Sequence, residues 1–282
     1  MKYAICNETF QGMAWPETCH AVASSGYQGI EVAPFTLAAN VGDISANARR
    51  DCADTARREG LEIVGLHWLL VSPKGLSVTD ADAAVRERTA IYLTDLVDFC
   101  ADLGGRILVF GSPAQRRLPT DVAPEQAAQA ARDRLLACIE PALQIAHERG
   151  ITICLEPLPA PEADFILSLE TAVDIISRLN HPALQTIFDV KSASSEGKAL
   201  PDLIRTYAPY IAHVHANDAN RRGPGFGATD YRPILSALEE VDYAGYVSVE
   251  VFDYTPDPFI IARDSLAYMQ RCELKEAGHD IR

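Results

Sequence analysis

The sequence predicts a single α/β domain with the architecture of a (β/α)8 barrel. Short apolar runs of the β type alternate with longer segments of helical periodicity about eight times along the 282 residues. The runs are rich in Ile, Val and Leu, as parallel strands covered on both faces are. The first βα turn lacks the G-x-G-x-x-G pattern of a dinucleotide-binding open sheet, which favours the closed barrel.

Eight short apolar segments are expected to form the strands. In chain order they are residues 3–6, 29–32, 62–67, 106–110, 151–156, 185–189, 211–215 and 246–250.

The intervening segments have the pattern of amphipathic helices. In residues 83–103 and 125–149, Ala and Leu recur at spacings of three and four, and charged residues occupy the other side. Gly60, Gly104 and Gly150 come just after such patterns and just before a strand, where a left-handed residue ends a helix. No linker, repeat or low-complexity stretch interrupts this order. We therefore expect one domain over residues 1–282, with a short C-terminal tail after about residue 273.

Composition and charge exclude several classes of protein. Lys and Arg number 25 against 39 Asp and Glu, a net charge of −14 that repels nucleic acids and anionic membrane surfaces. No apolar run is long enough to span a bilayer, and the N-terminus lacks a signal-peptide pattern. The seven cysteines are widely spread without a C-x-x-C pair, which argues against a disulfide framework or a thiolate zinc site. These features predict a cytoplasmic protein.

Ionisable residues end four consecutive predicted strands: Glu156, Asp189, His215 and Glu250. Catalytic groups of (β/α)8 barrels come from the C-terminal ends of the strands, so we expect these four side chains to converge. Three converging carboxylates repel one another, and a divalent cation relieves that repulsion. Oxygen ligands with one imidazole suit Mn²⁺, Mg²⁺ or Co²⁺ better than they suit a thiolate-type zinc site. Taken singly, each carboxylate has a simpler interpretation, as a helix cap or an arginine partner.

These strand ends resemble the metal site of the xylose-isomerase-like TIM barrels, and specifically the sugar phosphate isomerase/epimerase group. Its members include ketose 3-epimerases, hydroxypyruvate isomerases and inosose dehydratases. The resemblance covers nearly the whole chain. It is carried by Glu156-Pro157, Phe188-Asp189, His215, Glu250, Gly65-Leu66-His67-Trp68, Glu162 and the stretches 215–221 and 224–227.

The resemblance implies a metal-dependent sugar isomerase or epimerase. The metal ligands would be Glu156, Asp189, His215 and Glu250, with Mn²⁺ the favoured cation. The cation would hold a carbonyl and an adjacent hydroxyl of a small polyhydroxylated ketone or ketose, and stabilise an enediolate. Glu156 and Glu250 would be the catalytic residues that move the proton.

The same resemblance implies the substrate-binding residues. Glu162 and Arg221 would contact substrate hydroxyls and the carbonyl side, and His67 would be a sugar-binding histidine. Trp68 is expected to form an apolar wall against the sugar, whereas Trp15 is expected in the core. A simpler interpretation of His67, as a core imidazole hydrogen-bonded to the backbone, remains open.

One position departs from the ketose 3-epimerase pattern, which has a histidine three residues after the strand-six aspartate. This chain reads Asp189-Val-Lys-Ser192, so the hydroxyl of Ser192 replaces an imidazole that would contact the substrate. Plain ketose 3-epimerisation is therefore in doubt. The roles of Lys191 and of Glu31, an inward candidate ending the second strand, are left open. The type IV apurinic endonucleases of the superfamily use many more histidines than this chain offers.

Three functions fit these observations. The leading hypothesis is the isomerase or epimerase. The first alternative is a metal-dependent lyase of the same fold, acting as an inosose-type dehydratase or eliminating the aglycone of a keto-glycoside. The second is a sugar-binding protein that has lost catalysis.

The expected partner is a small-molecule carbohydrate, without nucleic acid or membrane. The chain has no phosphate-cradling glycine loop, which favours a non-phosphorylated substrate, although Arg116, Arg117 and Arg222 are candidates for an anion-binding group. The sequence leaves open whether the protein forms a homo-oligomer.

Overall fold

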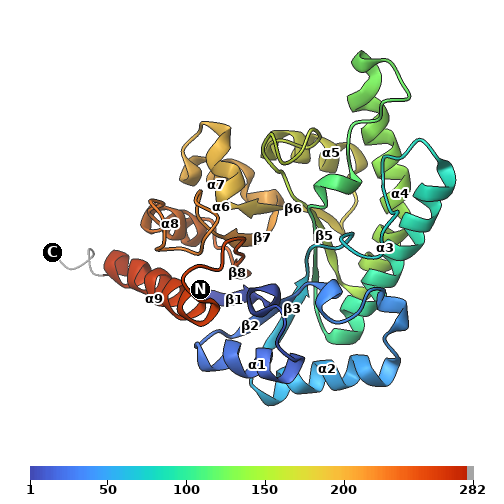
Figure 1. The fold of residues 1–282 in the computed structure, drawn as a ribbon. Coiled ribbons are helices and arrows are strands. Elements are labelled where there is room, and N and C mark those ends of the chain that lie inside the picture. Colours follow the sequence, from blue (N-terminus) through green and yellow to red (C-terminus); the bar gives the residue numbers. More distant parts are fainter. Residues whose placement is uncertain (278–282) are drawn as a thin grey trace.

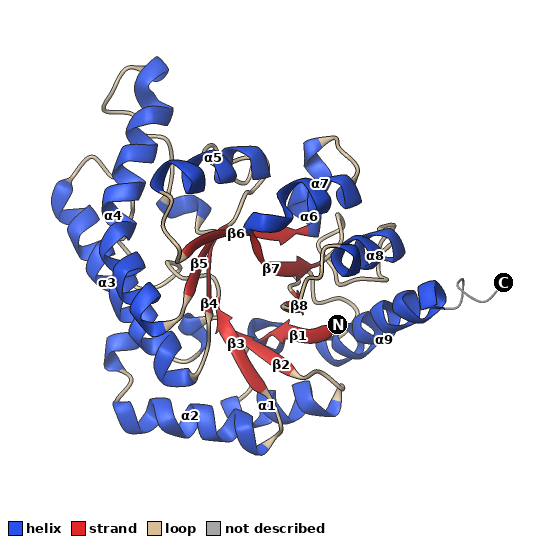
Figure 2. Ribbon diagram, turned by 180° about the vertical axis from the view of Figure 1, so that it is seen from behind, coloured by secondary structure: helices blue, strands red, loops and turns tan. Residues whose placement is uncertain are grey.

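Eight parallel strands form a closed barrel at the centre of the structure, in the order β1 to β8 with β8 pairing back onto β1. The computed structural model describes residues 1–277. A ring of helices encloses the barrel (Figures 1 and 2). The strands are β1 Lys2–Cys6, β2 Gly29–Val32, β3 Glu62–Leu66, β4 Ile107–Phe110, β5 Thr152–Leu155, β6 Leu184–Asp189, β7 Ile211–Ala216 and β8 Tyr246–Val249.

This architecture confirms the predicted single TIM barrel, and each predicted strand agrees with an observed one to within a residue or two at either end. The helices are α1 Trp15–Ser24, α2 Ala46–Arg58, α3 Ala83–Leu103, α4 Ala127–Arg149, α5 Leu169–Leu179, α6 Val190–Ala193, α7 Leu200–Tyr207, α8 Arg232–Glu240 and α9 Pro258–Ala277.

The predicted helix stops are also found. Gly104 and Gly150 are left-handed caps of α3 and α4, with φ of 85° and 66°. The helix predicted over 125–149 begins two residues later, because Pro124 first starts the 3-10 turn η5 Pro124–Gln126. The tail predicted after about residue 273 overlaps the end of α9, and its residues 278–282 lie outside the described residues.

Alternation along the strands separates two apolar layers. Leu108, Phe110, Leu155 and Phe188 belong to the large core between the sheet and the helices. The residues between them in sequence form a separate small cluster of Val109, Cys154 and Ile187, which therefore fills the barrel interior. The next interior position on β5 and β6 is two residues further along, at Glu156 and Asp189. The strand period thus places these carboxylates at the C-terminal mouth of the barrel.

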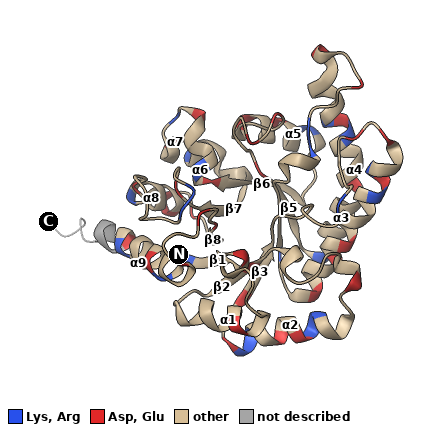
Figure 3. Cartoon of the chain, viewed as in Figure 1, with Lys and Arg blue, Asp and Glu red and all other residues tan. Residues whose placement is uncertain are grey.

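Acidic and basic residues are interspersed along outer helices such as α2 and α9 (Figure 3). All seven cysteines are unpaired, as their spacing predicted. None of the described helices combines the length and apolar character that crossing a membrane requires.

Candidate metal centre and active site

The four predicted ligands meet at the C-terminal mouth of the barrel. Glu156, Asp189, His215 and Glu250 are all buried, and one ligand atom from each lies within 4.8 Å of the others. They come from four adjacent strand ends, since Asp189 and His215 belong to β6 and β7 and the two glutamates directly follow β5 and β8. The convergence expected from their spacing is therefore observed.

Two atoms of this group are buried without a hydrogen-bond partner. His215 Nδ1 lies 3.2 Å from Glu250 Oε2 and 4.0 Å from Glu156 Oε1, but neither His215 Nδ1 nor Glu250 Oε2 makes a hydrogen bond. Asp189 Oδ1 accepts a hydrogen bond from the Ser192 backbone N–H, and Oδ2 accepts one from Asn217 Nδ2, both at 2.6 Å. Each of these oxygens keeps a further lone pair. Buried polar atoms are normally satisfied, so this group fits a cation bound among its oxygens and imidazole.

The charges of the group are poorly compensated by the protein alone. Burial raises the pKa of Glu156 to about 8, and the negative charges of Glu250 and Asp189 add to the shift. Burial and the charge of Glu250 also raise the pKa of Asp189. Carboxylates crowded in a buried site resist ionisation, and a divalent cation removes that resistance.

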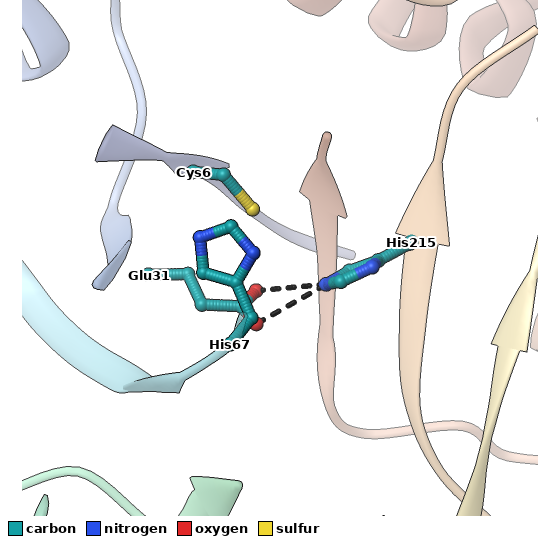
Figure 4. A group of neighbouring side chains, drawn as sticks. All are labelled: Cys6, Glu31, His67 and His215. Carbon is teal, nitrogen blue, oxygen red and sulfur yellow. Dashed lines mark hydrogen bonds and ion pairs between the residues drawn. The ribbon is translucent and has the colours of Figure 1, made fainter. Parts of the chain in front are cut away.

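Glu31 holds His215 from the opposite side of the barrel (Figure 4). Its carboxylate accepts from His215 Nε2 at 3.1 and 3.2 Å and from His213 Nε2 at 2.9 Å. Burial acts to raise the pKa of Glu31, but the two histidine charges outweigh it and hold the pKa well below its ordinary value. Because a carboxylate only accepts, the Nε2 of His215 carries a proton, and a cation would bind at Nδ1 once that nitrogen has lost its own proton. This contact gives Glu31 a role that the sequence left open.

A second group of possible ligands lies beside the first and consists of Cys6, Glu31, His67 and His215. Both Glu31 oxygens already accept hydrogen bonds from histidines. Burial raises the pKa of the Cys6 thiol to about 11, which keeps it protonated and a weak ligand. We therefore regard this group as support for His215.

Glu8 is a site residue that the sequence reading missed. It is fully buried in the 3-10 turn η1 Asn7–Phe10, and its Oε2 lies 2.9 Å from His67 Nε2. On its other side, His67 Nδ1 lies 3.4 Å from Glu250 Oε1. The sequence does contain a signal for Glu8. Alternate residues of a strand face the same side, and Glu8 comes two residues after Cys6, at the next interior position beyond the first strand. Both His67 nitrogens face carboxylates rather than backbone, and its binding of substrate stays a prediction.

Trp68 contacts both the site and an aromatic row. Its indole N–H donates to Glu250 Oε1 at 2.9 Å. Its ring stacks between Phe35 and Phe252, with centroid distances of 5.8 and 6.1 Å. This half-buried row has the apolar face expected of a wall. Trp15 packs at the edge of the core, as expected, and donates to the carbonyl of Cys52 at 3.0 Å.

The remaining predicted substrate-binding residues lie around the rim. Glu162 is exposed and is paired with Lys191, whose Nζ lies 2.9 and 3.1 Å from its two oxygens. The charged groups of Lys191 and Arg221 each lie 5.4 Å from the centre of the Phe252 ring. Ser192 is buried beside Asp189, and its hydroxyl has no partner among the described residues.

Gly111 leaves the space that Glu156 occupies. It directly follows β4, the neighbour of β5, and a Cβ built on it would lie 2.0 Å from Glu156 Oε2. Any side chain at this position would meet the carboxylate before it met anything else.

Comparison with known proteins places this barrel in a family. The sequence model of the xylose isomerase-like TIM barrels matches residues 19–272. The chain belongs to this family. This family is the one that the strand-end residues resemble. In the structure those residues converge at the mouth of the barrel.

Sugar epimerases are among the relatives within the xylose isomerase-like TIM barrels. D-psicose 3-epimerase of Ruminiclostridium cellulolyticum is 25% identical over 231 residues, 82% of this chain and 76% of that enzyme. The 3-dehydro-D-guloside 4-epimerase of Escherichia coli is 30% identical over 129 residues, about half of either chain. Other epimerases are matched over 48% to 62% of their own length.

A solved structure shows the same fold over almost the whole length. The apo crystal structure of 3-keto-D-glucoside 4-epimerase from E. coli superposes with a TM-score of 0.82, covering 96% of this chain and all of that one. The identity over this superposition is 22%, so it establishes the fold alone.

Proposed function

We propose that the protein is a divalent-metal-dependent sugar isomerase or epimerase acting on a small polyhydroxylated ketone or ketose. The observation that carries this proposal is the buried convergence of Glu156, Asp189, His215 and Glu250, in which two atoms lack partners. The names of the epimerase relatives support the choice of reaction.

The four converging residues are the proposed metal ligands. Three carboxylates and one imidazole form an oxygen-rich donor set that suits Mn²⁺, with Mg²⁺ and Co²⁺ as alternatives. When bound, the cation would supply Lewis-acid stabilisation of negative charge on the substrate oxygens.

Glu250 and Glu156 are the proposed catalytic residues, and their environments differ. Burial acts to raise the pKa of Glu250, but the nearby charges of His215 and His67 outweigh it and hold that pKa below its ordinary value. Glu250 is therefore ionised and suited to take the proton from the carbon next to the carbonyl. Glu156, the other carboxyl of the group, would return a proton to the enediolate. Two carboxyls within 4.8 Å of each other can serve the two steps of an epimerisation.

The substrate contacts are proposed from the rim residues. Trp68 would pack against the apolar face of the sugar, and His67, Glu162, Arg221 and Ser192 would bind its oxygens. The unpartnered Ser192 hydroxyl, buried beside Asp189, supports a polar contact there.

The same observation favours one alternative, a lyase. A small hydroxyl in place of an imidazole leaves room for a leaving group, so an inosose-type dehydratase or a keto-glycoside eliminating enzyme would also use this set of ligands.

The experiment that tests the proposal is mass spectrometry of reactions run in D₂O. The Mn²⁺-loaded protein is incubated with a panel of ketoses, inososes, hydroxypyruvate and 3-keto-glycosides. We expect at least one compound to gain one mass unit without losing a fragment, because a second carboxyl returns a proton taken from solvent. Loss of water or of an aglycone would instead establish the lyase.

Two variants make the experiment specific. Glu250→Gln should abolish deuterium incorporation, whereas Glu148→Gln, an exposed position on α4, should leave it unchanged. Binding of a sugar without incorporation or fragment loss across the whole panel would contradict both enzymatic functions and favour a sugar-binding protein.

A further inference from the structure

Arg116 is a buried cation without a partner. It follows the 3-10 turn η4 Pro113–Gln115 in the loop after β4, and its exposed fraction is 0%. It is among the largest fully buried side chains described, yet Nε, Nη1 and Nη2 all lack hydrogen-bond partners. Arginine is almost never fully buried unless it is paired, so these nitrogens call for a partner that the described protein atoms do not supply.

Three other cations near the strand ends contrast with Arg116. Lys191 is paired with Glu162 at 2.9 Å, and Arg222 with Asp253 at 2.9 Å. Arg117 donates to the carbonyl oxygen of Glu162 at 3.2 Å and lies 3.9 Å from Asp164. Each of these three is neutralised by a residue of the loops around it, and each is more exposed than Arg116.

The loop that carries Arg116 borders the proposed active site. It leaves β4 through Gly111, where an added Cβ would lie 2.0 Å from Glu156 Oε2. Two backbone hydrogen bonds hold its turn, from Gln115 N–H to Ser112 O at 3.0 Å and from Val78 N–H to Gln115 O at 2.8 Å. Burial lowers the pKa of Arg116 to about 10, and the charge of Glu156 counteracts this, so the two groups are within electrostatic range. Glu156 makes no hydrogen bond to it and remains available as a metal ligand.

The chemistry of the guanidinium selects the missing partner. A buried guanidinium without a hydrogen-bonded counter-charge is destabilising, and a bound anion removes that destabilisation. The five N–H donors lie in one plane and match the two oxygens of a carboxylate in a bidentate pair. Arg116 is a single enclosed cation, which suits a monoanion better than a phosphate dianion.

We infer that Arg116 binds a carboxylate group of the substrate, so that the protein acts on keto sugar acids rather than on neutral sugars. This inference rests on the proposed function, because it places the sugar at the mouth of the barrel with its terminal group towards the loop after β4. It assigns to Arg116 a specificity role that is separate from the proton transfer by Glu156 and Glu250.

The test compares three unreactive ligands that differ only in the group at C1: D-glucitol, D-gluconate and D-glucitol 1-phosphate. None has a carbonyl, so binding is measured whether or not the proposed reaction occurs. Isothermal titration calorimetry is done on the Mn²⁺-loaded full chain and on Arg116→Met, Arg116→Lys and the matched control Arg117→Met.

We expect D-gluconate to bind the unmodified protein about tenfold or more tightly than D-glucitol, as a charged hydrogen-bonded pair predicts. Arg116→Met should remove this preference while D-glucitol affinity stays within twofold. Arg116→Lys should retain part of the preference, and Arg117→Met all of it. A preference that survives in Arg116→Met, or an equal loss for both ligands, would overturn the inference. Tightest binding of the phosphate, lost in Arg116→Met, would overturn the choice of carboxylate.

Thermal unfolding of the ligand-free variants provides an independent measurement. Replacing an unpaired buried cation with an apolar side chain of similar volume should leave the melting temperature unchanged or raise it. A marked fall for Arg116→Met would show that the guanidinium has a structural partner, and would count against a substrate-binding role.

Discussion

The two halves of the barrel supply different kinds of polar group to the same site. Strands β5 to β8 contribute the proposed ligands, which include buried atoms without hydrogen-bond partners. Strands β1 to β3 and the segments that follow them contribute Glu31, His67 and Trp68, which contact His215 or Glu250. They also contribute Glu8, which contacts His67. Strands β5 to β8, the ligand half, therefore supply the atoms that would bind a cation. Strands β1 to β3, the supporting half, supply contacts that position the ligands Glu250 and His215.

Glu250 illustrates the division within a single carboxylate. Its Oε1 is held by Trp68 and His67 from the β3 side, whereas Oε2 has no hydrogen bond and faces His215. The same holds for His215, whose Nε2 donates to Glu31 and whose Nδ1 is free. Glu250 and His215 thus each have one atom that is held by the protein and one that is available to a cation.

The largest effect is expected from the ligand half. Glu250→Gln removes the proposed base, and the rate of deuterium incorporation should fall about 10³-fold, the range typical of a general base. The rate is measured by mass spectrometry on whichever sugar the unmodified protein labels. A variant that kept a tenth of the rate would show that Glu250 is not the base.

A smaller effect is expected from the supporting half. In the unmodified protein His213 and His215 share the two oxygens of Glu31, and Glu31→Gln leaves them one acceptor oxygen. The affinity for Mn²⁺ should therefore fall about 10-fold to 100-fold, while the fold is retained. Calorimetric titration of Mn²⁺ with circular dichroism as the folding check measures both. An unchanged affinity for Mn²⁺ would contradict the supporting role of Glu31.

The pH dependence of metal binding tests the ligand half in another way. The pKa of Glu156 is raised to about 8 in the cation-free protein, so a cation has to displace that proton below this pH. Burial acts to lower the pKa of His215, but the charges of Glu250 and Glu31 outweigh it and raise that pKa, so His215 also has to lose a proton. The apparent affinity should therefore fall at least tenfold per pH unit below 8. The free energy of unfolding changes in the opposite direction. Because the Glu156 pKa is raised from its ordinary value of 4.5, the cation-free protein should lose stability as pH rises from 4.5 towards 8.

Mn²⁺ titrations at pH 6, 7 and 8, each in two buffers of different ionisation enthalpy, count the protons released. We expect at least one proton per ion at pH 6 and fewer at pH 8. Release that does not change with pH would assign the raised pKa to a different group.

The smallest effect is expected for Trp68→Phe. This change keeps an aromatic ring in the row but removes the indole N–H bonded to Glu250, so catalytic turnover should fall about 3-fold to 10-fold. Metal affinity should change by less than twofold. A loss as large as that of Glu250→Gln would mean that the N–H takes part in the chemistry itself.

The sequence predicted the fold and the ligand half because both depend on local patterns. Apolar runs at regular spacing identify strands, and an ionisable residue at a strand end identifies a candidate ligand, as with Asp189 and His215. The supporting half depends on contacts that sequence spacing does not reveal, since Glu31 and His213 are 182 residues apart. Glu8 lies past its strand in a 3-10 turn, where a single acidic residue has no distinctive pattern.

Arg116 shows a different limit of sequence reading. It was grouped with Arg117 and Arg222 as three equivalent candidates for anion binding. What separates them is burial and pairing, and both depend on how the loops after β4, β5 and β7 pack.

Gly111 has a consequence for how such a site can be lost or altered over generations. Its replacement by alanine touches no proposed ligand in sequence and adds one methyl group at the end of β4, yet that methyl would occupy the position of the Glu156 carboxylate. Descendants carrying this change would keep every residue by which the family is recognised and still have a displaced Glu156. A substitution at position 111 can therefore remove the activity from a protein that retains every ligand residue.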